Sequence, residues 1–305
     1  MPDFEEFCER HLGSRIRAVL FESRSTNHVL GALLEDGRRV VVKAHRPRQS
    51  RELVEAVLRV QAAHAGAGFP CPRPLAGPAP LGEGLGTAEE LIDEGESRDT
   101  HDPALRRAMA ELLARHVEIA RACDEPTLAR NWDILQGDSL WPPERHDPSF
   151  DFEATAAGAE WIDRVAAEAR PRAAEPAEPI AGHMDWSGEH FRFTGDRATV
   201  VYDWDSLALR PEHHVVGAAA GTFTHNPPSG APLAPSPEEA AAFVDEYGAA
   251  RGRPPSTAER ERIAAMTTYV IAYIARCEHA LGQTPADDRT FSAALNRHTT
   301  AYLKH

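Results

Sequence analysis

The sequence predicts an α+β protein with a small, β-rich N-terminal lobe, residues 1–92 with one helix, and a larger, mainly helical C-terminal lobe, residues 93–305. Two observations lead to this prediction. Strand-like alternation and a hairpin signal come first in the chain, whereas helical periodicity dominates after residue 102. Strands followed by helices are typical of the α+β class, and 305 residues suffice to bury a large core.

Three strands are expected at the start of the N-terminal lobe, in residues 16–20, 28–34 and 39–44. Glu35-Asp36-Gly37 is a strong hairpin signal between the second strand and the third. Lys43 lies near the end of the third strand, which is rich in β-branched residues. An ammonium in a central strand is unfavourable unless it has a polar destination, so we expect Lys43 to point into a cleft.

The remaining elements are predicted from helical spacing and from Gly and Pro. Ser50 is expected to cap the helix of the N-terminal lobe. The expected ranges are a helix at 51–65, a loop at 66–80, an extended segment at 86–92, helices at 103–123 and 154–170, strands at 191–193 and 198–203, and mostly helix from 212 to 305 around a Pro-rich loop at 226–237.

Composition narrows the class of partner. The formal net charge of −14 argues against nucleic acid and anionic membranes, because both bind basic surfaces, and it suits a cationic small molecule better. Four scattered cysteines and an acidic N-terminus without an apolar stretch predict reduced thiols, no signal peptide and a cytoplasmic location. No apolar run approaches the ~18 residues that a membrane helix needs.

Lysine is almost absent from this chain. Of the 33 basic residues 31 are Arg and two are Lys, at Lys43 and at the penultimate position, Lys304. A compact ammonium cannot be replaced by a flat guanidinium where a single point charge is needed. The retention of Lys43 therefore indicates a specific task for it.

Carboxylates gather in two short motifs of the C-terminal lobe. His183-Met184-Asp185 opens the stretch HMDWSGEHF, and Asp203-Trp204-Asp205 follows an apolar strand. Three acids near one place repel each other, so a cation is expected between them.

A strand-borne Lys, an acid on the next helix, an HxD loop and a strand that ends in DWD follow each other in this order. The order resembles the aminoglycoside phosphotransferase family of the protein-kinase-like superfamily, over roughly residues 17–276 and including 109–116 and 210–212. The resemblance implies a two-lobe fold with a nucleotide cleft between the lobes. It also implies transfer of the γ-phosphate of ATP, with Mg²⁺, to a hydroxyl of a small molecule.

The resemblance assigns roles to individual residues. Lys43 would contact the α- and β-phosphates and be held by Glu52 or Glu55, between which the spacing does not decide. Asp185 would accept or orient the proton of the acceptor hydroxyl.

The metal ligands implied by the resemblance are Asp203 and the residue at the position of the family's Asn. That residue is His190 here, and imidazole prefers softer ions than Mg²⁺. Asp205 would either contact the metal ligands without binding the ion itself or help to bind a second metal ion.

The nucleotide would be covered by the turn that contains Ser25, Thr26 and Asn27, which has hydrogen-bond donors but no Gly. Glu90 and Leu91 would meet adenine through main-chain groups. The resemblance does not decide whether the acceptor is an aminoglycoside-like antibiotic, an amino alcohol or a sugar. It also does not decide between ATP and GTP as the phosphate donor, or between a monomer and a homodimer. Because of His190 and the turn without Gly, an inactive nucleotide- or ligand-binding protein is the alternative.

Overall fold

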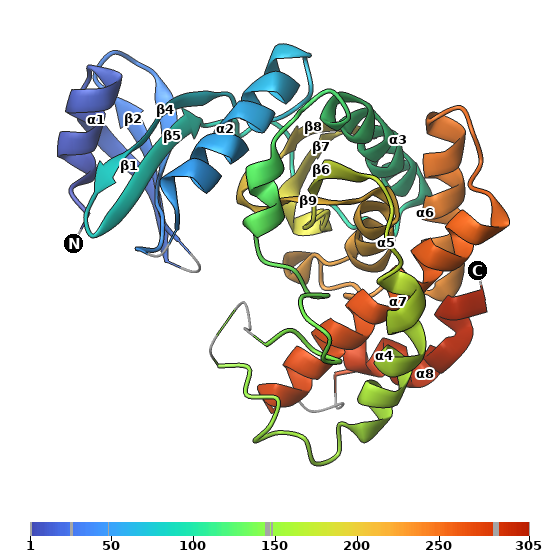
Figure 1. The fold of residues 1–305 in the computed structure, drawn as a ribbon. Coiled ribbons are helices and arrows are strands. Elements are labelled where there is room, and N and C mark those ends of the chain that lie inside the picture. The colour runs from blue at the N-terminus through green and yellow to red at the C-terminus, as the bar shows by residue number, and fades with distance from the viewer. Residues whose placement is uncertain are drawn as a thin grey trace.

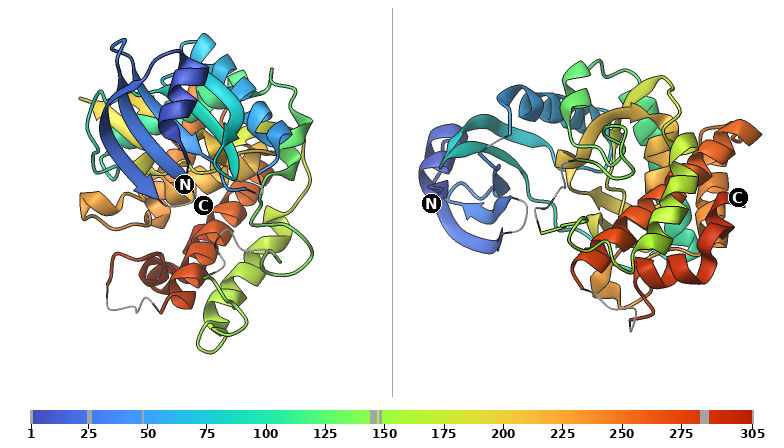
Figure 2. Two further views of the ribbon diagram at one scale, coloured as in Figure 1. Left: turned by 90° about the vertical axis from the view of Figure 1, so that its left-hand side faces the viewer. Right: turned by 60° about the horizontal axis from the view of Figure 1, so that its bottom comes forward.

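The computed structural model describes residues 2–24, 27–47, 49–143, 147, 149–282 and 287–304. An antiparallel sheet with two helices forms one lobe, and a mainly helical body forms the other (Figure 1). The two lobes are also distinct in the rotated views of Figure 2. This arrangement confirms the predicted fold class.

The N-terminal sheet has five strands in the order β1-β2-β3-β5-β4, all antiparallel to their neighbours. The expected second and third strands are confirmed, and the first is longer than expected. The strands are β1 (Ile16–Arg24), β2 (His28–Leu34), β3 (Arg39–Ala44), β4 (Pro74–Leu81) and β5 (Gly84–Glu90). β4 lies within the stretch expected to be a loop. Its prolines are tolerated because an edge strand has backbone N–H groups without a ladder partner.

Two helices belong to this lobe, α1 (Phe4–Leu12) and α2 (Arg51–Gly66), so the expectation of a single helix was wrong. Asp3 caps α1 by accepting from the backbone N–H of Glu6, and Gly13 ends it with a φ of 70°. The apolar face of α1 packs on one face of the sheet and forms the core of the lobe. Lys43 belongs to the opposite face, because Val42 and Ala44 on either side of it point towards α1.

The C-terminal lobe is built around α7, against which α4, α5 and α8 pack (Figure 1). Two small antiparallel sheets, β6–β9 and β7–β8, lie between the helices and the N-terminal lobe. The helices are α3 (Pro103–Ala120), α4 (Glu160–Ala173), α5 (Glu212–Thr222), α6 (Pro237–Ala250), α7 (Thr257–Ala280) and α8 (Phe291–His298), and the strands are β6 (Pro179–His183), β7 (Phe191–Thr194), β8 (Arg197–Val201) and β9 (Leu207–Pro211). α4 starts six residues later than expected, after Gly158 with a φ of 83°.

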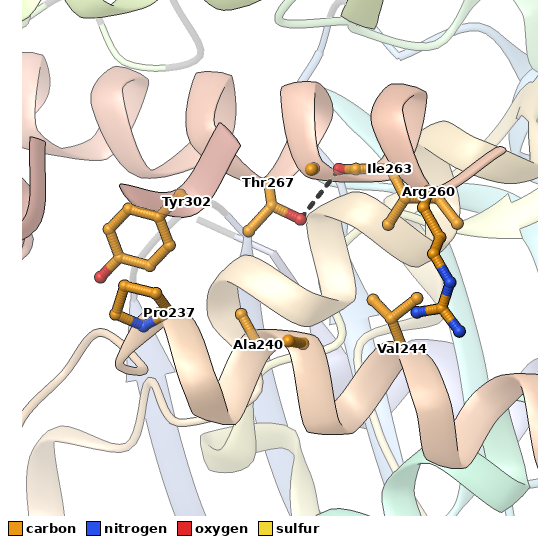
Figure 3. Close-up of a pocket in the computed structure, with 9 residues that line it drawn as sticks. Pro237, Ala240, Val244, Arg260, Ile263, Thr267 and Tyr302 are labelled. Atoms are coloured by element: carbon orange, nitrogen blue, oxygen red, sulfur yellow. Dashed lines mark hydrogen bonds between the residues drawn. The ribbon is translucent and has the colours of Figure 1, made fainter. Parts of the chain in front are cut away.

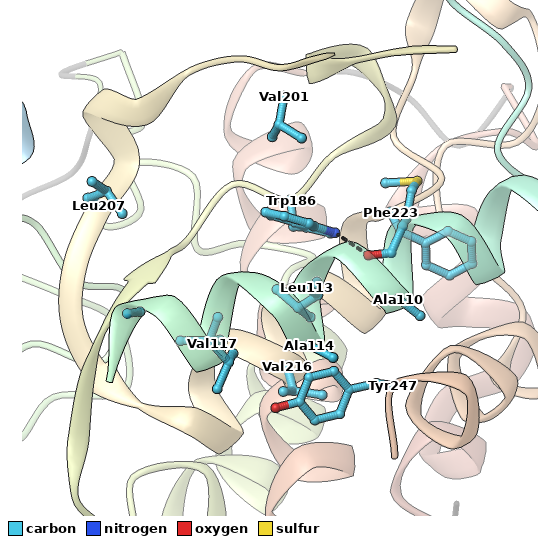
Figure 4. Packing of buried hydrophobic residues seen from close by; sticks show 14 of the residues in the cluster. Ala110, Leu113, Ala114, Val117, Trp186, Val201, Leu207, Val216, Phe223 and Tyr247 are labelled. Carbon is cyan, nitrogen blue, oxygen red and sulfur yellow. Dashed lines mark hydrogen bonds between the residues drawn. The ribbon is translucent and has the colours of Figure 1, made fainter. Parts of the chain in front are cut away.

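The core beneath the loops of the C-terminal lobe combines α3 with α5 and the small sheets. Figure 4 shows Trp186 on one side of α3, near Leu113, and Val216 on the other side of the helix beside Tyr247. Trp186 and Trp204 are almost completely buried. Trp186 directly follows Asp185, and Trp204 directly follows Asp203. The burial of each Trp therefore anchors the backbone next to the carboxylate that precedes it.

A small pocket lies between α6, α7 and the C-terminal segment with Tyr302 (Figure 3). Its volume of about 10 Å³ is no larger than one water requires. Within the part of the chain that the structure describes, no helix is both long and apolar enough to cross a membrane.

Candidate active site

The first acidic motif forms a tight loop at the end of β6. β6 ends at His183, Asp185 follows two residues later, and a short 3₁₀ turn, Gly188–His190, leads into β7. His183 is completely buried, and its Nε2 lies 2.9 Å from the carbonyl oxygen of Tyr202. Burial lowers the pKa of His183 to about 4, so the ring is neutral near pH 7 and supports the loop as a structural residue.

The second acidic motif turns sharply at its first residue. Asp203 has φ 60° and ψ 47°, a left-handed conformation that a non-Gly residue rarely adopts. Ser206 stabilises the turn by donating its hydroxyl hydrogen to the carbonyl oxygen of Asp203, at 2.9 Å. Backbone strain of this kind persists where the surrounding structure holds it, and it is common at functional sites.

Asp185, His190 and Asp203 come together at one point. One potential ligand atom from each lies within 4.8 Å of the other two. The Nε2 atom of His190 is 3.0 Å from a carboxylate oxygen of Asp185 and 3.9 Å from one of Asp203. The two motifs therefore meet, and His190 stands between their acids.

Electrostatics distinguishes the two carboxylates. Desolvation by the surrounding protein opposes the ionisation of Asp185, although its side chain is 45% exposed, but the hydrogen bond and charge of His190 outweigh it and hold the pKa of Asp185 well below its usual range. Burial also works against a charged His190, yet Asp185 raises the pKa of His190 to about 9. Burial raises the pKa of Asp203, against the opposing charge of His190. At neutral pH His190 is an imidazolium between the two acids.

The donor set fits Mg²⁺ in part. Hard carboxylate oxygens are the ligands that Mg²⁺ prefers, and Asp185 and Asp203 offer them from two sides of one point. A protonated imidazole cannot ligate a metal, and a neutral one favours softer ions. The two acids therefore suit Mg²⁺, whereas His190 suits it poorly as a ligand.

Lys43 is held by a different acid from the one expected. Its ammonium is 3.2 Å from Glu89 on β5 and 3.7 Å from Asp205, while Glu52 is exposed and Glu55 pairs with Arg51. The expected pairing of Lys43 with Glu52 or Glu55 was wrong. The cause is sheet register: Val41 lies opposite Glu89 and Lys43 opposite Thr87, so the side chain of Glu89 emerges on the same face as Lys43.

Asp205 connects the two lobes and does not belong to the three-residue ligand group. Its carboxylate accepts from the side-chain amide of Asn27 at 3.0 Å and pairs with Lys43. Burial works against ionised Asp205, but the charge of Lys43 lowers its pKa. Burial likewise works against charged Lys43, but Asp205 and Glu89 raise its pKa. The N-terminal lobe thus reaches the DWD turn through one ammonium and one amide.

The expected nucleotide contacts are only partly visible. Ser25 and Thr26 lie outside the described residues, and Asn27 is the part of their turn that contacts Asp205. The backbone N–H groups of Glu90 and Leu91 donate to the carbonyl oxygens of Arg73 and Arg39, at 2.9 and 3.0 Å. These two N–H groups are therefore engaged in the lobe itself, and the adenine contact stays a prediction.

Comparison with known proteins decides the family. The model of the phosphotransferase enzyme family (APH) matches residues 20–266, which is most of the chain. The chain belongs to this family. It is accordingly a small-molecule phosphotransferase, as the order of its motifs predicted. No curated protein matches the sequence.

Solved structures share the fold at low sequence identity. Amicoumacin kinase hAmiN, in complex with AMP-PNP, Ca²⁺ and Ami, has a TM-score of 0.63 and 13% identity, over 94% of this chain and 88% of that one. A Plasmodium vivax ethanolamine kinase has a TM-score of 0.56 and 12% identity, over 93% of this chain and 81% of that one. A mutant of aminoglycoside phosphotransferase APH(4)-Ia, in ternary complex with ADP and hygromycin B, has a TM-score of 0.56 and 13% identity, over 98% and 97%.

Proposed function

We propose that this member of the family transfers the γ-phosphate of ATP, with Mg²⁺, to a hydroxyl group of a small, cationic molecule. The convergence of Asp185 and Asp203 opposite the Lys43–Glu89 pair carries the proposal. Phosphoryl transfer needs positioning and neutralisation of charge more than covalent chemistry, and this arrangement supplies a base, a hard metal ligand and a fixed cation.

Each residue has a distinct part in this proposal. Lys43, held by Glu89, binds phosphate oxygens as a point charge. Asp185 remains ionised and is 45% exposed at its side chain, so it can accept a hydrogen bond from the acceptor hydroxyl and orient it. Asp203 would hold Mg²⁺, which when bound neutralises charge on the phosphates.

The cationic acceptor rests on overall charge. The net charge of −14 favours a positively charged substrate. The acids of α6 add nothing to this argument, because Glu239 pairs with His101, Asp245 with Arg260 and Glu246 with Arg106. Aminoglycoside-like antibiotics and amino-alcohol or sugar metabolites are the candidate classes. A monomer and a homodimer both remain compatible with this proposal.

The test is a search for phosphorylated product. The protein is incubated with ATP or GTP, with Mg²⁺ or with EDTA, and with a panel of aminoglycosides, amino alcohols and sugars. Mass spectrometry then detects a gain of one phosphoryl group. We expect product from at least one cationic acceptor with ATP and Mg²⁺, and none with EDTA. Product from neutral acceptors alone would overturn the cationic acceptor, and the absence of product with every acceptor would overturn the transfer.

One observation favours the alternative of an inactive nucleotide-binding protein. The side chain of His190 lies between Asp185 and Asp203, with its Nε2 atom 3.9 Å from the acid that would hold the metal. Calorimetry separates the two functions: ATP binding that does not depend on Mg²⁺, together with no product from the panel, favours the inactive protein. A strong dependence of ATP affinity on Mg²⁺ favours the enzyme.

A further inference from the structure

Helix α3 carries a buried histidine that contacts the loop with Asp185. His116 is completely buried, and its Nε2 atom accepts the backbone N–H of His183 at 3.0 Å. A side chain from one element thereby determines the position of a peptide group just before Asp185.

A second contact from the same helix lies just after Asp185. The indole N–H of Trp186 donates to the carbonyl oxygen of Met109 at 3.2 Å, the bond drawn in Figure 4. Met109 and His116 are separated by two helical turns and therefore lie on the same face of α3. Asp185 is flanked on both sides by residues that α3 holds.

The protonation of His116 follows from its hydrogen bond. An Nε2 that accepts has no hydrogen, so the neutral ring must carry its hydrogen on Nδ1. Burial lowers the pKa of His116 well below its usual range, which keeps the ring neutral. Nδ1 is itself buried, and although the backbone of Ala181 lies close enough to the ring to raise its pKa slightly against burial, no described residue meets Nδ1 with full hydrogen-bond geometry.

An imidazole with one unsatisfied buried nitrogen costs stability that an apolar side chain would not. The surroundings do not require an imidazole for packing either. The ring stacks on His64 of α2, with centroids 4.7 Å apart and planes at 27°, and lies 5.8 Å from Trp186. The Nε2 acceptor is the feature that an apolar side chain would lose.

We propose that His116 is a positioning residue for phosphoryl transfer, whose ring nitrogen fixes the backbone at His183 and so holds Asp185 against the acceptor hydroxyl. The proposal rests on the proposed function for its kinetic effect, but not for the backbone contact itself. Loss of the contact displaces Asp185, and a displacement of about 1 Å costs roughly 10²-fold in rate.

The test compares His116→Gln, which keeps an acceptor at similar reach, with His116→Leu, which fills the space without one. His214→Leu is the matched control, because His214 is also a buried histidine on a helix and its Nε2 lies 2.8 Å from the carbonyl oxygen of Ala173. kcat and KM for ATP are measured for each variant, and NMR hydrogen exchange follows the amide of His183.

We expect His116→Leu to lower kcat by about 10²-fold with KM for ATP changed less than about threefold. The His183 amide should then exchange at least about tenfold faster, His116→Gln should recover most of kcat, and His214→Leu should leave kcat unchanged. If the Leu variant does not fold, His116→Met replaces it, because Met fills irregular space without an acceptor of comparable strength.

Two results would overturn the proposal: a kcat for His116→Leu or His116→Met equal to that of the control, or an unchanged exchange rate of the His183 amide. Failure of the proposed function looks different. In that case the unmodified protein gives no product, while the exchange of the His183 amide still responds to the substitution.

Discussion

The two halves of the candidate site differ in how they are assembled. In the C-terminal half, Asp185, His190 and Asp203 come from neighbouring loops that one small sheet, β7–β8, connects. In the N-terminal half, Lys43 and Glu89 come from strands that are distant in sequence and meet through sheet register. Residues joined by a short loop can be recognised from a motif, whereas residues joined by register require the pairing of strands to be known.

The largest expected effect tests the C-terminal half. Asp203→Asn removes the charge of the candidate metal ligand and keeps the shape of its side chain. We expect phosphoryl transfer to fall by about 10³-fold, and the Mg²⁺ dependence of ATP binding to weaken, since removal of one electrostatic contact at a reacting centre costs roughly 10²–10³-fold. Steady-state kinetics and calorimetry over a range of Mg²⁺ concentrations measure both effects. Unchanged kinetics would remove Asp203 from the site.

Acid stability should also depend on the C-terminal lobe. Burial lowers the pKa of His183 and of His214 to about 4, below the value near 6.5 of an unfolded histidine. A depressed histidine pKa means that the unfolded state binds more protons between these values, so stability falls as pH falls from about 6.5 towards 4. We expect a loss on the order of 3 kcal/mol from His183 and a further loss in the same direction from His214. Urea unfolding from pH 7 to 4 measures it.

His214→Leu provides the control for the acid effect. It removes the contribution of His214 to the pH dependence of stability and leaves the contribution of His183. The slope of stability against pH should become smaller in this variant. A slope equal to that of the unmodified protein would show that His214 does not titrate as its burial implies.

A smaller effect is expected in the N-terminal half. Glu89→Gln removes the carboxylate beside Lys43, and we expect kcat/KM for ATP to fall by about 10–10²-fold, since the ammonium loses a charged hydrogen-bond partner worth roughly 1.5–3 kcal/mol. Glu52→Gln is the matched control, because Glu52 is an exposed acid of α2, and should change kcat/KM less than twofold. If the two substitutions had equal effects, Glu52 of α2 would again be a candidate partner of Lys43.

The smallest effect concerns the contact between the lobes. Asn27→Ala removes the hydrogen bond to Asp205, and we expect KM for ATP to rise about threefold to tenfold, consistent with the ~1 kcal/mol of one such bond. Initial rates at varied ATP concentration measure it. A lower KM would show instead that the contact competes with the nucleotide.

The sequence predicted the fold class and the strands β2 and β3 because alternation and the Glu35-Asp36-Gly37 turn are local signals. Helix α1 was missed although Asp3 and Gly13 are ordinary signals for the two ends of a helix. β4 was missed because prolines suggest a loop and edge strands are the exception. The division of the lobes between residues 92 and 93 stays a prediction.

In the candidate site too, local motifs were predicted from the sequence and long-range contacts were not. The proximity of Asp185 and Asp203 could be expected from two motifs, but the position of His190 between them required coordinates. Glu89 carried one usable signal, since alternation in β5 places it on the same face as Thr87. Nothing local indicated that β5 pairs with β3, so the nearer acids of α2 were preferred to Glu89.

The central claim is that Asp185 carries out the transfer while the Lys43–Glu89 half binds the nucleotide. The direct measurement compares the unmodified protein with Asp185→Asn, by phosphoryl transfer to the acceptor and by calorimetry with ATP and Mg²⁺. We predict a loss of transfer of about 10³-fold, with a Kd for ATP within about threefold, because loss of a positioned proton acceptor typically costs 10²–10⁴-fold. Transfer at the rate of the unmodified protein would contradict the account.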